Sequence, residues 1–179
     1  MTKKEKSRIK ILHAAKVLLE KNGVGNVTFD QIADESDMCR TTIFNHFSTT
    51  SDLLFAIYSD EIEELKEVCR NSGEEGIPLV MLLFRKLVED TVNYPALTLQ
   101  LITNAVLRGP EDNPMKAIEK LVADNLVTAG FRDAELYTIR ITGAYYGLLN
   151  HYLINGYDFN IDEITEKLSD IITRILEVD

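Results

Sequence analysis

The sequence predicts an all-α protein of about nine helices. Apolar residues recur at intervals of three and four along the whole chain, which is the spacing of one face of an α-helix. The chain has only nine Gly and four Pro among 179 residues, and no segment shows the apolar and polar alternation of a strand. With 45% hydrophobic residues, a chain of this length builds its core without disulfides or a metal.

The helix boundaries follow from capping and breaking residues. Asn22-Gly23 ends the first helix, and Thr28 offers an N-cap hydroxyl to the second. Asp37 tolerates the left-handed backbone of a tight turn before the third helix, and Thr50 or Ser51 caps the fourth. The predicted helices cover residues 3–21, 28–35, 39–45, 51–70, 75–93, 95–107, 113–129, 133–155 and 160–178.

The later helices are separated by the same kinds of residue. Pro95 suits the first turn of a helix, and Gly109-Pro110 follows the end of that helix. Gly130 and Gly156 end two further helices. These breaks divide the second half of the chain into five helical segments.

Charge is distributed unevenly along the chain. The net charge is −10, but residues 1–55 carry +1 and the remainder carries −11. Residues 1–10 alone hold five basic side chains and one acidic one. This asymmetry is expected when only the N-terminal end must approach phosphate groups.

The sequence argues against several other classes of protein. The two longest uncharged runs, residues 91–107 and 141–157, are shorter than a membrane span and contain Asn, Gln or His, so we expect no membrane insertion. No signal peptide is indicated, so we expect a cytoplasmic protein. There is no nucleophile motif, Gly-rich phosphate loop or metal-ligand spacing, so neither an enzyme, a cofactor nor a metal is predicted.

Two smaller features have simple interpretations. The acidic residues of the fourth predicted helix, Asp60, Glu61, Glu63, Glu64 and Glu67, are interpreted as a solvated face. Cys39 precedes a helix and is a weak candidate for a redox-active thiol, because no resolving cysteine is near it in sequence.

Residues 28–47 are compatible with a helix-turn-helix, in which the second helix enters a major groove. A plain pair of short helices has the same pattern. The composition of the second helix favours DNA binding, because Ile43 and Phe47 anchor it inward while its other face offers hydrogen-bonding groups. Those groups belong to Arg40, Thr41, Thr42, Asn45 and His46.

This segment resembles the TetR family of bacterial transcriptional repressors over about residues 8–56. The residues that carry the resemblance are Ile11-Leu12-His13-Ala14-Ala15, Gly23, Thr28-Phe29-Asp30-Gln31-Ile32-Ala33, Thr42-Ile43-Phe44-Asn45-His46-Phe47 and Leu53-Leu54. The rest of the chain is similar to the family in helical content and length.

The resemblance implies roles for individual residues. Thr28 and His46 would contact phosphates, and Arg40, Thr41, Thr42 and Asn45 would lie at or near the bases. Asp37 and Thr41 stand where small residues or Gly are frequent in the family, and at two other positions a phosphate contact is missing. Phe44 replaces a common Tyr whose hydroxyl reaches a phosphate, and Thr50 replaces a common phosphate-binding Lys. The N-terminal arm, Lys4 and Lys6 in particular, would then supply more of the electrostatic attraction.

Two uncharged predicted helices carry a few polar and aromatic residues that suit a ligand cavity. The candidates are Tyr94, Gln100, Asn104, Tyr145 and Asn150. A core with a few satisfied polar groups, or a dimer seam, has the same composition. The mixture favours a neutral or weakly polar small-molecule effector over a charged one.

The last two predicted helices are the candidates for dimerisation, because their small and apolar residues can form a four-helix interface with a second copy. These residues include Gly143, Gly147, Ile164, Leu168 and Ile172.

Together these features predict a DNA-binding domain at residues 1–50 and a helical regulatory, ligand-binding and dimerisation domain at 51–179. The predicted function is that of a homodimeric transcriptional repressor that binds a palindromic operator in double-stranded DNA and is released by a small molecule. The alternative is a helical ligand-binding or scaffolding protein that has lost tight DNA binding at Phe44 and Thr50.

Overall fold

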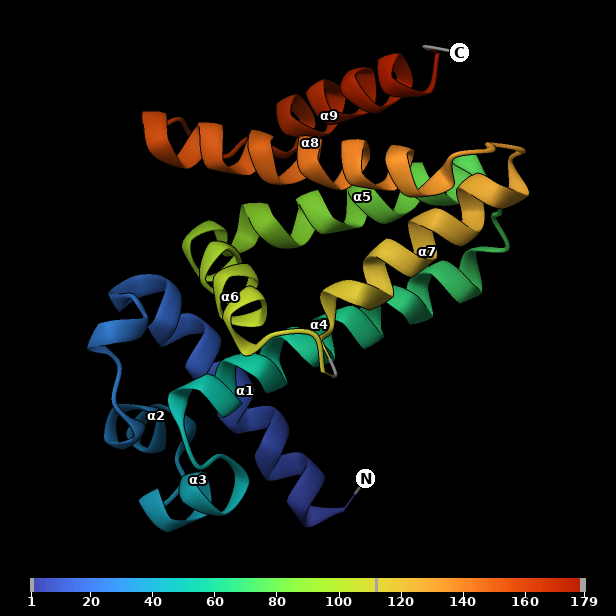
Figure 1. The fold of residues 1–179 in the computed structure, drawn as a ribbon. Coiled ribbons are helices and arrows are strands. Elements are labelled where there is room, and N and C mark those ends of the chain that lie inside the picture. Colours follow the sequence, from blue (N-terminus) through green and yellow to red (C-terminus); the bar gives the residue numbers. More distant parts are fainter. Residues whose placement is uncertain (1, 112, 178–179) are drawn as a thin grey trace.

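The computed structural model describes residues 2–111 and 113–177, and in this part of the chain it contains nine α-helices, one short 3-10 helix and no strand (Figure 1). The all-α prediction is therefore confirmed. The helices are α1 (Lys3–Asn22), α2 (Phe29–Ser36), α3 (Arg40–His46), α4 (Thr50–Ser72), α5 (Ile77–Asn93), α6 (Pro95–Arg108), α7 (Met115–Thr128), α8 (Ala134–Asn155) and α9 (Ile161–Leu176), with the 3-10 turn at Val24–Asn26.

Capping explains most of the helix boundaries. Thr28 caps α2, as the sequence predicts, and the structure adds a reciprocal capping box with Gln31. Asp37 ends α2 in the left-handed conformation, with φ 54° and ψ 43°. The prediction for α4 was wrong by one position: its N-cap is Thr49, whose hydroxyl accepts from the Asp52 amide at 3.0 Å, and Thr50 is the first helical residue.

Helices α1, α2 and α3 form one end of the molecule, and α4 runs from this end into the larger helical part (Figure 1). The α1–α3 end is held by apolar residues that are almost fully buried, among them Ile11, Ala15, Ile32, Ile43 and Phe47. Buried residues continue without a break along α4 into the rest of the core, from Leu53 to Cys69. Helix α4 therefore belongs structurally to both parts.

The larger part is built on α5. Helix α5 packs against α7 and α9, while α8 packs against α6, α7 and α9. Helices α8 and α9 lie at the end farthest from α3 (Figure 1). Helix α6 crosses between the two parts and contacts α1, α4, α5 and α8.

Among the described residues, none of the helices is long and apolar enough to span a bilayer.

Candidate nucleic-acid interface

The core of α1–α3 determines which face of α3 is exposed. Ile43 and Phe47 are buried, as predicted, and hold α3 against α1 and α2. Phe29 of α2 lies edge-to-face with Phe44, with 5.0 Å between the ring centroids. This contact fixes Phe44 at the rim of the exposed face, where 45% of the residue remains accessible.

The exposed face of α3 carries four of the predicted contact residues. Arg40, Thr41, Phe44 and Asn45 are exposed. Thr42 differs, because it is half-buried and its hydroxyl lies 2.9 Å from the Cys39 sulfur in a local hydrogen bond. That hydrogen bond lowers the pKa of the exposed Cys39 thiol.

Arg40 is held in place by two neighbours. Its guanidinium donates to Asp30 at 2.7 Å and lies over the Phe44 ring, 5.4 Å from the centroid. Both charged side chains are exposed, and an ion pair of this kind contributes little stability. Arg40 is thus positioned beside the exposed face but remains free to exchange Asp30 for another acceptor.

His46 joins α3 to the N-terminal arm. Its Nε2 atom lies 3.1 Å from the Ser7 hydroxyl. Partial burial lowers the pKa of His46, and the positive charges of Lys4 and Arg8 lower it further. His46, Lys4 and Arg8 therefore lie near one another, although the Arg8 guanidinium is bound by Asp60 of α4.

The remaining predicted phosphate ligands lie around this face. Lys6 is exposed on the first turns of α1, and the Thr28 hydroxyl is engaged with Gln31 in the capping box. Thr50 is half-buried at the start of α4. The structure thus brings an arm, a helix N-terminus and one polar helix face to the same end of the molecule.

Residues 11–57 match the family model of the bacterial regulatory proteins of the tetR family. The N-terminal region of this chain is therefore similar to the DNA-binding region of that family. No curated protein sequence matches the chain. The segment that was predicted to carry the resemblance, about residues 8–56, is therefore confirmed.

Solved structures share the fold over nearly the whole chain. FadR from Bacillus subtilis, in complex with stearoyl-CoA, matches with a TM-score of 0.75 at 15% identity, covering 94% of this chain and 97% of that chain. FadR from Thermus thermophilus, a TetR-family repressor in complex with lauroyl-CoA, matches with a TM-score of 0.65 at 23% identity, covering 95% and 93%. GusR from Salmonella enterica matches with a TM-score of 0.74 at 20% identity, covering 99% and 98%. The fold is thus that of TetR-type DNA-binding regulators.

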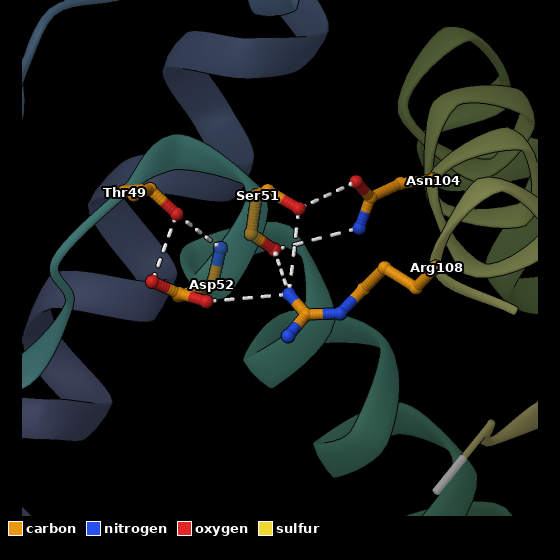
Figure 2. A network of polar contacts seen from close by, with 5 residues as sticks. All are labelled: Thr49, Ser51, Asp52, Asn104 and Arg108. Atoms are coloured by element: carbon orange, nitrogen blue, oxygen red, sulfur yellow. Dashed lines mark hydrogen bonds and ion pairs between the residues drawn. The ribbon is translucent and has the colours of Figure 1, made fainter. Parts of the chain in front are cut away.

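The first turn of α4 is joined to the end of α6 in this TetR-type fold (Figure 2). The Ser51 hydroxyl donates to the Asn104 side-chain oxygen at 3.0 Å. Arg108 donates to the Ser51 carbonyl at 3.2 Å and to Asp52 at 3.3 Å, and its guanidinium lies over the Phe55 ring. Thr49 and Arg108 both bond to the Asp52 carboxylate and lower its pKa. The Asn104 amide thus connects two helices, and its predicted role in a ligand cavity stays a prediction.

Helix α6 also contacts the DNA-binding end at its other terminus. The Glu20 carboxylate of α1 accepts from the backbone amides of Leu97 at 2.8 Å and Ala96 at 3.4 Å. A carboxylate is favoured at a helix N-terminus, where unpaired amides and the helix dipole are positive. Helix α6 is therefore fastened to α1 at one end and to α4 at the other.

Two further ion pairs join α1 to α4, and sequence reasoning missed both. Arg8 pairs with Asp60, and Lys16 pairs with Glu61 at 2.9 Å. Burial alone would lower the pKa of Lys16, but the neighbouring Glu61 carboxylate outweighs burial and raises it, so Lys16 is charged. The interpretation of Asp60 and Glu61 as solvated was therefore wrong. No spacing within α4 distinguishes them, because their partners lie on another helix.

Two small internal cavities lie in the larger part, with volumes of about 20 and 10 Å³. Tyr145 borders both, and its hydroxyl is 2.6 Å from that of Thr91, which also borders both. Of the five predicted ligand residues, only Tyr145 borders these cavities. Tyr94 and Gln100 are half-buried elsewhere, and Asn150 is exposed on α8 because it faces away from the core.

The predicted dimerisation residues divide into two groups. Ile164, Leu168 and Ile172 are buried in the core of this chain, because α9 packs its apolar face on α5 and α8. They do not line a free surface, which corrects the prediction. Gly143 and Gly147 are exposed on α8 and remain available for an interface.

Proposed function

We propose that this protein is a homodimeric, sequence-specific DNA-binding transcriptional repressor that a small-molecule effector releases from a palindromic operator. The observation that carries this proposal is the exposed face of α3. It presents the Arg40 guanidinium and the Asn45 amide beside the His46 and Lys4 cluster, within a region that matches the TetR family. Arg and Asn side chains are the usual bidentate readers of guanine and adenine in the major groove.

Dimerisation is required for tight binding to such a site. One helix-turn-helix covers only a half-site, and two must be held about 34 Å apart, or a multiple of that distance, to read a palindrome. The exposed side of α8 is the proposed contact. It presents Leu136, Ile139, Gly143, Gly147 and Ile154 at spacings of three, four and seven, with Ile139 60% and Ile154 82% exposed.

The effector site is proposed for the larger part, where the cavities beside Tyr145 and Thr91 are lined mostly by apolar side chains, with Glu61 and Asp90 also bordering the larger one. The present cavities hold about one water molecule, so an effector must enlarge them. This lining favours a ligand with an apolar portion and without a negative charge beside these carboxylates. Two of the structures of similar fold hold acyl-CoA, whose acyl chains are apolar groups of this general kind.

Helices α4 and α6 are proposed to carry the signal. A ligand acts on DNA binding only through its different affinity for two arrangements of the protein. Helix α6 contributes Ile102 to the wall of the larger cavity and bonds through Asn104 and Arg108 to the start of α4. A displacement of α6 would therefore move the helix that leads directly to α3.

Selection of bound duplexes from random DNA tests the function. Wild-type protein is expected to enrich a palindrome. Arg40→Ala and Asn45→Ala are each expected to reduce the preference for the selected duplex over random DNA by about 1–3 kcal/mol, since each removes a base contact.

Lys4→Ala is the matched control. It is expected to weaken binding to all duplexes alike and to reduce the slope of log affinity against log salt by about one. If recognition-helix variants bind the selected duplex as tightly as wild type, α3 does not read the bases. Failure of the wild type to select any duplex would favour the alternative, a helical ligand-binding or scaffolding protein.

A further inference from the structure

Arg8 lies beside the proposed DNA-binding face, although sequence reasoning did not single it out. Its neighbour Ser7 is hydrogen-bonded to His46, the last residue of α3, with 3.1 Å between the Ser7 hydroxyl and the His46 Nε2 atom. The positive charges of Lys4 and Arg8 both lower the pKa of this imidazole, so both lie near it. Because a guanidinium binds phosphate in a fixed, two-pronged geometry, Arg8 is the strongest phosphate donor of this group.

The Arg8 guanidinium is occupied by a carboxylate of α4. Its Nη2 atom donates to Asp60 Oδ1 at 3.0 Å, and its Nη1 atom donates to Asp60 Oδ2. This two-pronged arrangement is the one in which Arg also binds a phosphate. Asp60 therefore holds the donors that a DNA phosphate would use, and the pair presents no net charge to a duplex.

The pair between Arg8 and Asp60 is exposed enough to open. The two side chains are 35% and 39% exposed, and an ion pair of this kind contributes little stability. The other ion pair between the two helices, Lys16 with Glu61, is more buried, with side chains 24% and 18% exposed. Helices α1 and α4 therefore stay joined through Lys16 and Glu61 when Arg8 leaves Asp60.

The position of α4 determines where the Asp60 carboxylate lies. Asp60 and Glu61 are adjacent on α4. Their partners on α1, Arg8 and Lys16, are eight residues and about 12 Å apart along the helix. The two helices therefore cross at this point (Figure 1), and the carboxylates reach α1 on both sides of the crossing. A displacement of α4 changes how well Asp60 reaches Arg8.

We propose that Arg8 is a further phosphate-binding residue and that Asp60 of α4 controls its availability. An arrangement in which α4 holds Arg8 binds DNA less tightly than one in which α4 releases it, because a backbone phosphate must displace the carboxylate. This inference rests on the proposed function, since it concerns the regulation of the same DNA-binding surface. It adds a contact through which α4 changes DNA affinity without any change in α3.

Asp60→Asn is expected to tighten DNA binding. The variant keeps the size of the side chain and removes the charge that competes with phosphate. The affinity is expected to rise about two- to fivefold for a selected duplex and for a random duplex alike, because a phosphate contact does not depend on base sequence. The slope of log affinity against log salt is expected to steepen by about one. Fluorescence anisotropy over a range of salt concentrations measures both quantities.

Arg8→Gln distinguishes competition for Arg8 from a simple addition of charges. If Asp60 acts by holding Arg8, the loss of affinity caused by Arg8→Gln is expected to be larger in the Asp60→Asn variant than in the wild type, since only there is the guanidinium free beforehand. Charges that act independently at long range would give the same loss in both proteins. The double variant, Arg8→Gln with Asp60→Asn, completes this cycle.

Glu63→Gln is the matched control. It removes one negative charge from the same helix, but the partner of Glu63 is Lys66 of α4 itself. Its DNA affinity is expected to equal that of the wild type at about 0.15 M salt, where exposed charges farther apart than roughly 8 Å are screened. All the substituted side chains are at least partly exposed, and circular dichroism checks that each variant is folded.

Either of two results overturns this inference and leaves the proposed function intact. In the first, the wild type binds a selected duplex and Asp60→Asn binds it no more tightly. In the second, Arg8→Gln causes the same loss of affinity in the wild type and in Asp60→Asn. A wild type that binds no duplex even at low salt would instead overturn the proposed function, and this inference with it.

Discussion

Arg40 and Asp30 illustrate how a side chain that is proposed to contact DNA is held without being fixed. The guanidinium is bonded to Asp30 at 2.7 Å and lies over the Phe44 ring. An exposed ion pair is worth at most about 1 kcal/mol, so little is lost when Arg40 leaves Asp30 for a base. Phe44, which lacks the hydroxyl of the family's common Tyr, still supports Arg40 by stacking.

His46 is expected to make DNA binding depend on pH. Burial and the charges of Lys4 and Arg8 hold the pKa of His46 below its ordinary value near 6.5, so the imidazole is neutral at pH 7 in the free protein. A phosphate beside it favours the protonated form, so the complex takes up a proton. Affinity is therefore expected to rise as pH falls, by at most about tenfold per pH unit.

Fluorescence anisotropy on a selected duplex, over a range of about pH 8 to 5.5, measures this dependence. His46→Gln keeps a hydrogen-bonding side chain near Ser7 but cannot be protonated, so its affinity is expected to change less over the same range. Equal pH dependence in the two proteins would show that His46 is not the group that takes up the proton.

At the scale of elements, α6 is the helix that connects the two ends of the protein. Glu20 caps its N-terminus from α1, and Asn104 and Arg108 bond to the first turn of α4 (Figure 2). Arg108 makes contacts with Ser51 and Asp52 and also covers Phe55, so its removal affects a hydrogen-bond network and a ring contact together.

Arg108→Ala is expected to loosen the start of α4. The loss of hydrogen bonds to a charged donor, together with the ring contact, is expected to lower the free energy of unfolding by about 1–2 kcal/mol. Hydrogen exchange at residues 50–55 is expected to become faster, because the α4 turn loses its support from α6.

Arg174→Ala is the matched control, because Arg174 makes an exposed ion pair with Asp170 within α9. This variant is expected to leave the free energy of unfolding and the hydrogen exchange at residues 50–55 nearly unchanged. Unchanged exchange at residues 50–55 in Arg108→Ala would mean that α6 does not hold α4 in place.

These elements also show what the sequence can and cannot predict. The helix-turn-helix was predictable, because Thr28, Asp37, Ile43 and Phe47 act through local capping and a local apolar pattern. The hydrogen bonds of Asn104 were not predictable, because a polar residue on an apolar helix indicates that it has a partner without identifying that partner. Its partner Ser51 lies 53 residues away.

A sequence pattern that does not identify its partner also explains why dimerisation residues were predicted on α9. Ile164, Leu168 and Ile172 form an apolar stripe that must be buried, and the sequence analysis assigned it to contact with a second copy. Periodicity does not say whether the covering surface belongs to the same chain or to a second copy. In this fold α5 and α8 cover the stripe, so the exposed side of α8 is the contact that we propose for a partner.

For the whole molecule, the charge distribution gives DNA binding a direction. Residues 1–55 carry a net charge of +1 and the remainder −11. The acidic remainder is therefore repelled by the duplex, while the basic residues 1–10 are attracted to it. A dimer doubles both effects. The orientation needed for α3 to enter the groove is thus favoured before any base contact forms.

Gly143 and Gly147 provide the test of how two chains assemble. Both lie inside α8, where glycine is less favourable than alanine by about 1 kcal/mol. A Cβ added at either position meets no atom of this chain within 4 Å, so packing within the monomer does not require glycine. A close approach by another helix would require it.

Gly143→Ala and Gly147→Ala are therefore expected to raise the stability of an isolated chain by about 0.5–1 kcal/mol each, while bulkier substitutions block the dimer. Gly143→Leu with Gly147→Leu is expected to sediment as a monomer at concentrations where wild type is dimeric, with helical content unchanged by circular dichroism. The monomer is expected to lose tight binding to a palindrome and to retain weak binding to a half-site. If the double Leu variant remains dimeric, α8 does not form the interface through these glycines.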